Sequence, residues 1–385
     1  MYREGLGRPL TWTELDGNFK EVADTGTAAQ TAASSAQVSA SVSAAAAKAE
    51  ADRAKQITGL NTVADAIGLA SLPFPDVWIP LSDSLRMLAG YGREVKVGDD
   101  VVANYATLTR NSAATMISKS GQRVNAAINE ARFERGGLLV EKKSTNKVTR
   151  STPIKDVLPG QWSTSSASIT PDPSPYFGFN LSSIKSLEGG TSYVNPNQSI
   201  NIEAGKVYSI SFVFMLVDGA SQLRLAVDPI FTGSFVSVYI SPSGEFSEGA
   251  SLINKKCKRF FDTNLFEVTL SILATQSGNS RCILFYPPSY GNNGLIKIGE
   301  VQVEEGDGNT SYIPTNGQAT TRDADKLTIP RLNNDCAEWY SGPDQINPIV
   351  TADTIELYPP AGKAHLRNVR GFFTPLIPEQ KKALK

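Results

Sequence analysis

The chain of 385 residues is long enough for two or three domains, and its hydrophobic fraction of 41 % suffices for a substantial core. Its 37 basic and 38 acidic residues give a net charge of −1, which excludes a basic field for a nucleic acid and an acidic tail. The N-terminus lacks an apolar run of signal-peptide length, and the following alanine-rich stretch is too polar to span a bilayer, so no membrane insertion is expected.

The first predicted element is a short amphipathic helix. Leu15, Phe19 and Val22 recur at i, i+4 and i+7, which predicts a helix over residues 13–22. The threonines and the glycine at residues 25–27 should break this helix and cap the next one.

A second helix is predicted from about residue 28 to residue 57. Residues 28–49 are half alanine, the strongest helix former, and five more are serine. Side chains this small bury little surface within one chain. The pattern therefore predicts a stem in which several copies pack side by side.

The expected seam of this stem follows the 4-3-4 spacing of a coiled coil and consists of Val38, Val42, Ala45 and Ala49. The register breaks, or the stem ends, near residues 51–55. Thirty helical residues form a spacer of about 45 Å. Because alanine seams discriminate oligomeric states poorly, the residues alone leave dimers and tetramers open beside a trimer.

The remainder of the chain is predicted to be mainly β. Segments that alternate, or that are rich in β-branched and aromatic residues, recur from about residue 84 at intervals of about 8–15 residues. This rhythm is typical of an antiparallel β-sandwich of the jelly-roll type. The expected divisions are an N-terminal segment 1–26, a stem 27–70, a proline-containing linker with first strands 71–105, a β-sandwich 106–330 and a C-terminal extension 331–385.

Three blocks of the sequence carry a resemblance to a known family. They read GLGRPLTWTELDGNFKEV, ATLTRNSAATMISKSGQRVNAAINEARFERGGLLVEKKSTN and VQVEEGDGNTSYIPTNGQATTRDADKLTI. In this order they resemble bacteriophage tail fibre and tail proteins, in which a tail-docking segment precedes an Ala/Ser-rich coiled coil and a jelly-roll, carbohydrate-binding-like domain. The chain departs from the family pattern at Lys142, Lys143 and Ser144, and residues 330–385 match no part of it.

The resemblance implies a homotrimeric structural protein of the virion, located in the phage tail and assembled in the host cytoplasm. Its N-terminal segment would dock on tail or baseplate proteins through Pro9, Leu10, Trp12, Leu15 and Phe19. Its β domain would serve host attachment and receptor binding, or make structural contacts.

Charged residues near the end of the third block suggest a fastening point. Arg322 with Asp323 and Asp325 is expected to hold the end of the β domain by charge-assisted hydrogen bonds.

Catalysis is not expected. His365 is the only histidine, and no Cys/His cluster suits zinc. Glu304 and Glu305 would point to opposite faces of a strand, so they do not form the carboxylate pair of a glycosidase. A polysaccharide depolymerase is therefore the least favoured of three function hypotheses.

No cofactor is expected, with one reservation. Five carboxylates are candidate oxygen ligands for a structural calcium ion: Glu304, Glu305, Asp307, Asp323 and Asp325. Solvated loop carboxylates are the better interpretation. Cys257, Cys282 and Cys336 have no metal-like spacing and are expected to be free thiols, with a Cys257–Cys282 bridge or an interchain bond from Cys336 as alternatives.

Aromatic residues in turn-rich segments are candidates for stacking on a host-surface polysaccharide: Trp162, Tyr176, Tyr193, Tyr286 and Tyr290. Packing in the core or at an interface is the alternative for each. The favoured function is an adhesive tail fibre. The runner-up is a structural tail adaptor whose residues 331–385 contact another virion component.

Overall fold

The computed structural model describes residues 11–58, 72–154, 162–188, 191–196, 200–217, 219–231, 233–248, 252–260, 263–289, 294–331, 336–358 and 362–384, with the backbone alone over 42–58. The chain forms two compact units. One is built by residues 1–72 with 378–384, and the other by residues 73–377.

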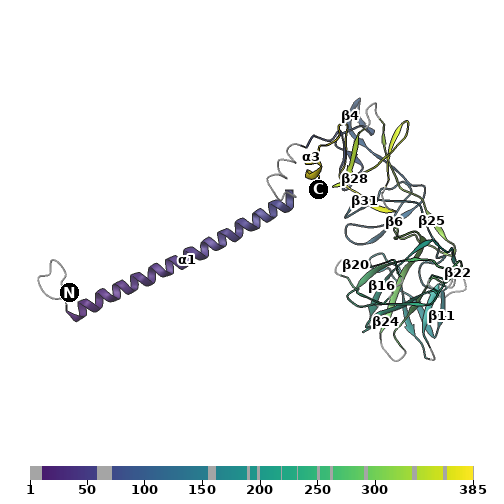
Figure 1. Ribbon diagram of the computed structural model, residues 1–385, viewed down its shortest axis with the longest axis horizontal. Coiled ribbons are helices and arrows are strands. Elements are labelled where there is room, and N and C mark those ends of the chain that lie inside the picture. Colours follow the sequence, from purple (N-terminus) through teal and green to yellow (C-terminus); the bar gives the residue numbers. More distant parts are fainter. Residues whose placement is uncertain are drawn as a thin grey trace. The chain divides into compact units, whose positions relative to one another are not determined.

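The first unit consists mainly of one helix, α1 (Trp12–Thr58), and also contains α3 (Pro378–Ala383) (Figure 1). A capping box starts α1. The Thr11 N–H donates to the Glu14 carboxylate at 2.9 Å, and the Glu14 N–H reaches the Thr11 hydroxyl at 3.4 Å. Two donors that the helix itself cannot satisfy are thereby paired.

The predicted break at residues 25–27 is wrong, because α1 continues through it. A single glycine costs a helix only about 1 kcal/mol, which the flanking alanines outweigh. Thr25 and Thr27 donate their hydroxyls to carbonyls one turn earlier, at 2.7 and 2.9 Å. The 47 residues of α1 span about 70 Å rather than the predicted 45 Å.

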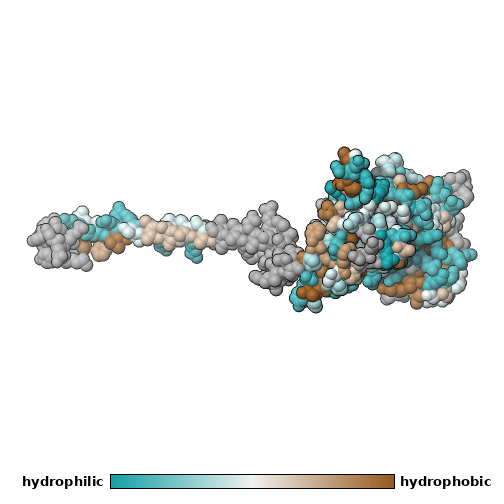
Figure 2. Space-filling model, turned by 90° about the horizontal axis from the view of Figure 1, so that it is seen from above, coloured by the Kyte–Doolittle hydropathy of each residue, from teal (hydrophilic) through white to brown (hydrophobic). Residues whose placement is uncertain are grey.

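The sides of α1 are open where the structure describes them. Trp12, Phe19 and Val38 are 82 %, 61 % and 62 % exposed. The visible face of α1 in Figure 2 mixes hydrophilic patches with weakly and more strongly hydrophobic ones. Pro9 and Leu10, and the side chains of the seam residues after Val38, lie outside the described residues. The coiled coil and the trimer therefore stay predictions. No helix in the described part of the chain combines the length and apolarity needed to cross a membrane.

The second unit contains a sandwich of two six-stranded antiparallel sheets (Figure 1). The first sheet has the order β11 (Trp162–Ser165), β14 (Tyr193–Pro196), β23 (Ile283–Tyr286), β17 (Leu223–Val227), β18 (Val236–Ile240), β19 (Phe246–Glu248). The second sheet has the order β12 (Ala167–Pro171), β13 (Leu181–Ser186), β24 (Leu295–Glu305), β16 (Val207–Val217), β21 (Leu265–Leu273), β20 (Asn254–Arg259). A separate pair joins β15 (Ile200–Ile202) to β22 (Gly278–Ser280). The prediction of a mainly β chain with a β-sandwich is confirmed.

Alternation along β16 explains the core of this sandwich. Tyr208, Ile210, Phe212 and Phe214 all enter the cluster between the sheets, as their spacing predicts. The ring of Phe212 meets the ring of Phe285 edge-on at 4.9 Å between centroids, and Phe285 belongs to the first sheet. Aromatic contacts of this kind join the two layers.

A bulge interrupts β24 at Glu300. Two residues of β24 oppose the single residue Phe212 of β16. Glu300 adopts a φ of 52°, in the left-handed region that non-glycine residues rarely occupy. The bulge shifts the core-facing positions from Ile298 to Val301, so that the carboxylate of Glu300 leaves the sandwich core.

A second hydrophobic core lies in the same unit. Its four-stranded sheets are β1 (Val77–Ile79), β32 (Val369–Phe372), β27 (Glu338–Ser341), β28 (Asp344–Ile346), and β29 (Ile349–Val350), β30 (Thr354–Leu357), β26 (Lys326–Pro330), β5 (Thr107–Thr109). Its three-stranded sheets are β31 (Lys363–Leu366), β9 (Gly137–Glu141), β8 (Phe133–Glu134), and β2 (Arg86–Met87), β4 (Asp100–Tyr105), β3 (Arg93–Val97). The pairs β6 (Ala114–Ile117) with β7 (Arg123–Ala126) and β10 (Ser144–Asn146) with β25 (Thr320–Arg322) also belong to this unit.

This second core joins segments from both sides of the sandwich. Leu108 pairs with Leu327, and Leu327 pairs with Leu357. Leu327 and Leu357 lie on opposite sides of the predicted boundary at residue 330, so strands of the predicted extension 331–385 share a sheet with β26. The sandwich is an insertion between β10 and β25. Local sequence patterns do not reveal such long-range pairing.

A fully buried ionic cluster links the second and third sequence blocks. It consists of Arg110, Arg132, Glu141, Arg322 and Asp325. Arg110 and Arg132 contact opposite oxygens of Asp325 at 2.9 and 2.5 Å, and Arg132 also contacts Glu141 at 2.8 Å. Burial disfavours the charge on Glu141, but Lys363, Arg132 and Arg322 outweigh burial and lower its pKa to about 2.

The predicted fastening role of Arg322 is confirmed for its ion pair with Asp325. Its guanidinium lies 3.5 Å from Asp325 and donates to the backbone carbonyl of Asp323 at 3.1 Å. The carboxylate of Asp323 is instead partly exposed, 3.9 Å from Lys143.

Candidate functional site

A row of polar and aromatic side chains crosses the outer face of the first sheet. Leu225, Val238 and Phe285 point into the sandwich core. Their strand neighbours Arg224, Tyr239 and Tyr286 therefore point outward. Arg224 on β17 pairs with Tyr239 on β18 and with Tyr286 on β23, so the three side chains lie abreast.

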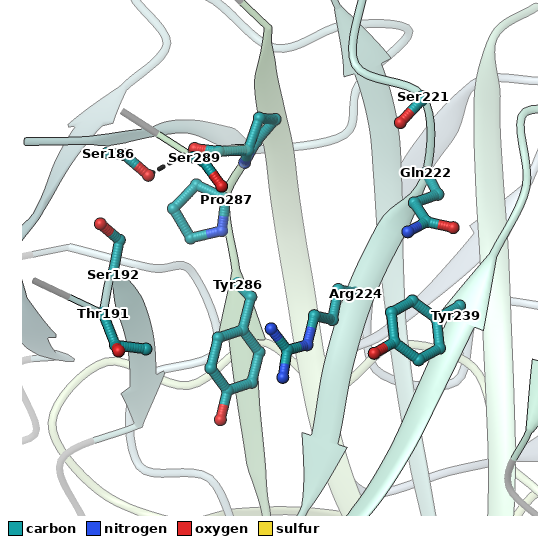
Figure 3. A pocket seen from close by; sticks show the side chains of 11 residues that line it. Ser186, Thr191, Ser192, Ser221, Gln222, Arg224, Tyr239, Tyr286, Pro287 and Ser289 are labelled. Carbon is teal, nitrogen blue, oxygen red and sulfur yellow. Dashed lines mark hydrogen bonds between the residues drawn. The ribbon is translucent and has the colours of Figure 1, made fainter. Parts of the chain in front are cut away.

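Arg224 occupies the middle of this row. Its guanidinium carbon lies 4.5 Å from the ring centre of Tyr286 and 5.9 Å from that of Tyr239. The ring of Tyr193 on β14 follows beyond Tyr286, at 6.1 Å between centroids and tilted by 55°. Figure 3 shows the guanidinium between the two tyrosine rings. Cation–π attraction holds these side chains in place on an open sheet face.

The row borders a pocket of about 510 Å³, the Tyr286 pocket. Hydroxyl, amide and proline side chains complete its lining: Ser186, Thr191, Ser192, Ser221, Gln222, Pro287, Pro288 and Ser289. Thr191 and Ser192 lie beyond Tyr286, and Gln222 lies near Tyr239 (Figure 3). The pocket thus combines aromatic faces with many hydrogen-bonding groups.

Some of these polar groups are fixed and others are available. Ser192 donates to the Ser166 carbonyl at 2.7 Å, and Ser186 donates to the Pro288 carbonyl. The side chains of Ser221 and Gln222 make no hydrogen bond to any residue that the structure describes. They can pair with a ligand without losing a protein partner.

The structure unites two of the five aromatic candidates. Tyr193 and Tyr286 belong to one row on the first sheet. The prediction for Trp162 is wrong, because its side chain is 1 % exposed and its indole N–H donates to the Arg150 carbonyl at 3.0 Å. Tyr176 packs edge-on against Phe177, outside this pocket. Tyr290 lies outside the described residues.

Sequence reasoning missed Arg224 and Tyr239. Both alternate with apolar residues in the segments LRLAV and VSVYI, which marks them as outward-facing. The sequence does not show which strands are neighbours in the sheet. It therefore does not predict that Arg224 and Tyr239 lie near Tyr286.

The carboxylates considered for calcium do not converge. Glu304 is buried and accepts hydrogen bonds from Ser144 and Thr310, whereas Glu305 faces outward and pairs with Lys206 at 3.1 Å. Over the described ranges, no group of three or more His, Cys, Asp or Glu side chains could hold a metal ion. Cys257 and Cys282 are free thiols, and burial raises the pKa of Cys282 to about 12.

Comparison with known proteins adds two likenesses among solved structures. One is a xylan-binding domain from Paenibacillus barcinonensis, with 14 % identity, covering 43 % of this chain and 94 % of that chain, at a TM-score of 0.25. The other comes from carbohydrate-binding modules of the β-sandwich superfamily, with 10 % identity, coverage of 59 % and 83 %, and a TM-score of 0.22. No family model and no curated protein matches the chain. Because both TM-scores are low, neither likeness decides what this chain binds.

Proposed function

We propose that this protein is a bacteriophage tail fibre whose β-sandwich binds a host-surface glycan at the Tyr286 pocket. The observation that carries the binding role is the row of Tyr193, Tyr286, Arg224 and Tyr239 beside a polar pocket. The three sequence blocks support the assignment to a phage tail.

The chemistry of the row suits a sugar. A pyranose ring presents C–H groups on its faces and hydroxyls around its edge. The tyrosine rings supply apolar faces, while Ser221 and Gln222 supply donors and acceptors for the hydroxyls. Arg224 can donate to ring or hydroxyl oxygens while it stays stacked on Tyr286.

In this proposal the remaining parts serve attachment. Helix α1 acts as the stem of a homotrimer, and the N-terminal segment docks on a tail or baseplate protein. The sandwich binds polysaccharide and does not cleave it.

Binding of purified host-surface polysaccharide to the full chain tests the glycan role. Tyr286→Ala should reduce affinity by about tenfold, the value of one lost stacking contact. Tyr176→Ala is the matched control, because Tyr176 is 36 % exposed and lies outside the pocket. Equal affinity of both variants would place binding elsewhere. Absence of binding in the unmodified chain would favour the adaptor role, and release of reducing ends would establish a depolymerase.

A further inference from the structure

A second pocket, of about 380 Å³, lies between the second sheet and the strands of the second core. One wall comes from β20, β21 and the residue after β20, and the opposite wall from β6, β7, β8 and β31. The charged and aromatic residues that line it are Arg123, Glu134, Arg135, Lys258, Arg259, Phe260, Glu267, Lys363 and His365.

Positive charge predominates in this pocket. Five lining residues are basic and two are acidic. The carboxylate of Glu134 is engaged, since it contacts His365 Nε2 at 2.8 Å and accepts the Ile117 N–H at 2.7 Å. The ammonium groups of Lys258 and Lys363 make no hydrogen bond or ion pair within the described part of the chain. Lys258 is therefore available to a ligand, whereas the charge of Lys363 also lowers the pKa of Glu141 and Glu134.

The floor of the pocket is rigid. Arg123 forms two hydrogen bonds to Glu300 Oε2, at 2.6 and 3.1 Å, and its side chain is only 8 % exposed. Its guanidinium also lies 4.9 Å from the ring centre of Phe179. The bulge in β24 places Glu300 at this position. Arg123 is therefore held in place before a ligand binds.

We propose that this pocket binds an acidic sugar through its carboxylate, at a site separate from the Tyr286 pocket. The lysines of the pocket attract an anion. Glu134 and Glu267 favour a singly charged carboxylate over a doubly charged phosphate, because they repel the second charge. Glu267 can also accept hydrogen bonds from sugar hydroxyls. That the ligand is a saccharide rests on the proposed function of the chain.

Calorimetric titration of the full chain tests this site with glucuronic acid, glucose and inorganic phosphate as probes. Glucuronic acid should bind, glucose should not, and phosphate should bind more weakly. Lys258→Gln and Lys363→Gln should each reduce glucuronic acid affinity by about tenfold. Lys185→Gln is the control, because Lys185 is exposed on β13 and outside the pocket.

The outcomes are distinguishable. No binding of glucuronic acid, or equal affinity of the Lys258→Gln and Lys185→Gln variants, overturns the proposal. Phosphate binding as tight as that of glucuronic acid also overturns it, because the site would then be a general anion site. Tyr286→Ala should leave glucuronic acid affinity unchanged, so failure at this pocket is separate from failure at the Tyr286 pocket.

Discussion

Arg132 and Asp325 stand 193 positions apart in the chain and meet at 2.5 Å, with neither side chain exposed. Arg132 belongs to the second sequence block and Asp325 to the third. Removing charges from water is costly, so this pair persists only because Arg110, Glu141 and Arg322 complete the arrangement. The two blocks are thus parts of one buried structure, which explains how segments on both sides of the sandwich are held together.

Asp325→Asn should destabilise the protein strongly. Loss of the carboxylate leaves Arg110 and Arg132 as buried cations without their shared partner, at a cost of about 3–5 kcal/mol. Urea unfolding at neutral pH measures this change in free energy. Asp323→Asn is the control and should cost less than about 1 kcal/mol, since its carboxylate is partly exposed. Similar costs for the two variants would contradict a structural role of the cluster.

Glu141 should make the protein sensitive to acid. Its pKa falls from 4.5 in the unfolded chain to about 2 in the folded one, so its contribution is present above about pH 4.5 and is lost as pH falls towards 2. The contribution amounts to about 3 kcal/mol. Urea unfolding across this range should show the stability advantage of the natural chain over Glu141→Gln shrinking by that amount. A constant advantage would refute the depressed pKa.

Glu300 should make the protein less stable as pH rises, which is the opposite of the effect of Glu141. Burial raises its pKa to about 7 despite the attraction of Arg123, so its folded state holds a proton that the unfolded state has released above pH 4.5. Its contribution is complete below about pH 4.5 and is lost as pH rises through 7, by about 3 kcal/mol. The advantage of the natural chain over Glu300→Gln should decrease over this window in denaturant titrations. An advantage that stays constant over this window would mean that Arg123 holds Glu300 ionised.

Oligomeric state tests the stem. Light scattering of the full chain at micromolar concentration should give three times the chain mass of 41.3 kDa. Val38→Lys places a charge in the predicted seam and should lower the thermal stability of the oligomer. Ser39→Lys, one position outside the seam, should not. A monomeric mass for the natural chain would contradict the prediction that α1 is the stem of a trimer.

The strands were predictable where one strand carries its own pattern. Tyr208, Ile210 and Phe212 alternate with polar residues, and the core follows from that spacing alone. The predicted helix break at residues 25–27 was wrong because the high helix propensity of the long flanking segments outweighs a glycine and two threonines. The prediction of Trp162 as a glycan-binding residue was wrong because the turn residues around it indicate an exposed backbone. The indole side chain itself lies in the core.

The candidate sites were less predictable because they depend on pairing across the sheet. Tyr193 and Tyr286 were identified from their surroundings, but Arg224 becomes a partner of Tyr286 only through the adjacency of β17 and β23. Lys258 and Lys363 lie in different sheets and share a pocket only after the chain has folded. Contacts between distant segments leave little trace in a single sequence.

Because the sandwich is inserted between β10 and β25, its strands are synthesised before the second core is complete. All twelve strands of its two sheets emerge from the ribosome before residue 306, so this part can fold while translation continues. Strand β1 must wait for β32, nearly three hundred residues later, because Val77 pairs with Gly371. Until then, the apolar residues of the second core that precede the sandwich lack the core residues that follow it. A chain truncated before residue 369 would carry a finished sandwich on an incomplete base, a species prone to aggregation.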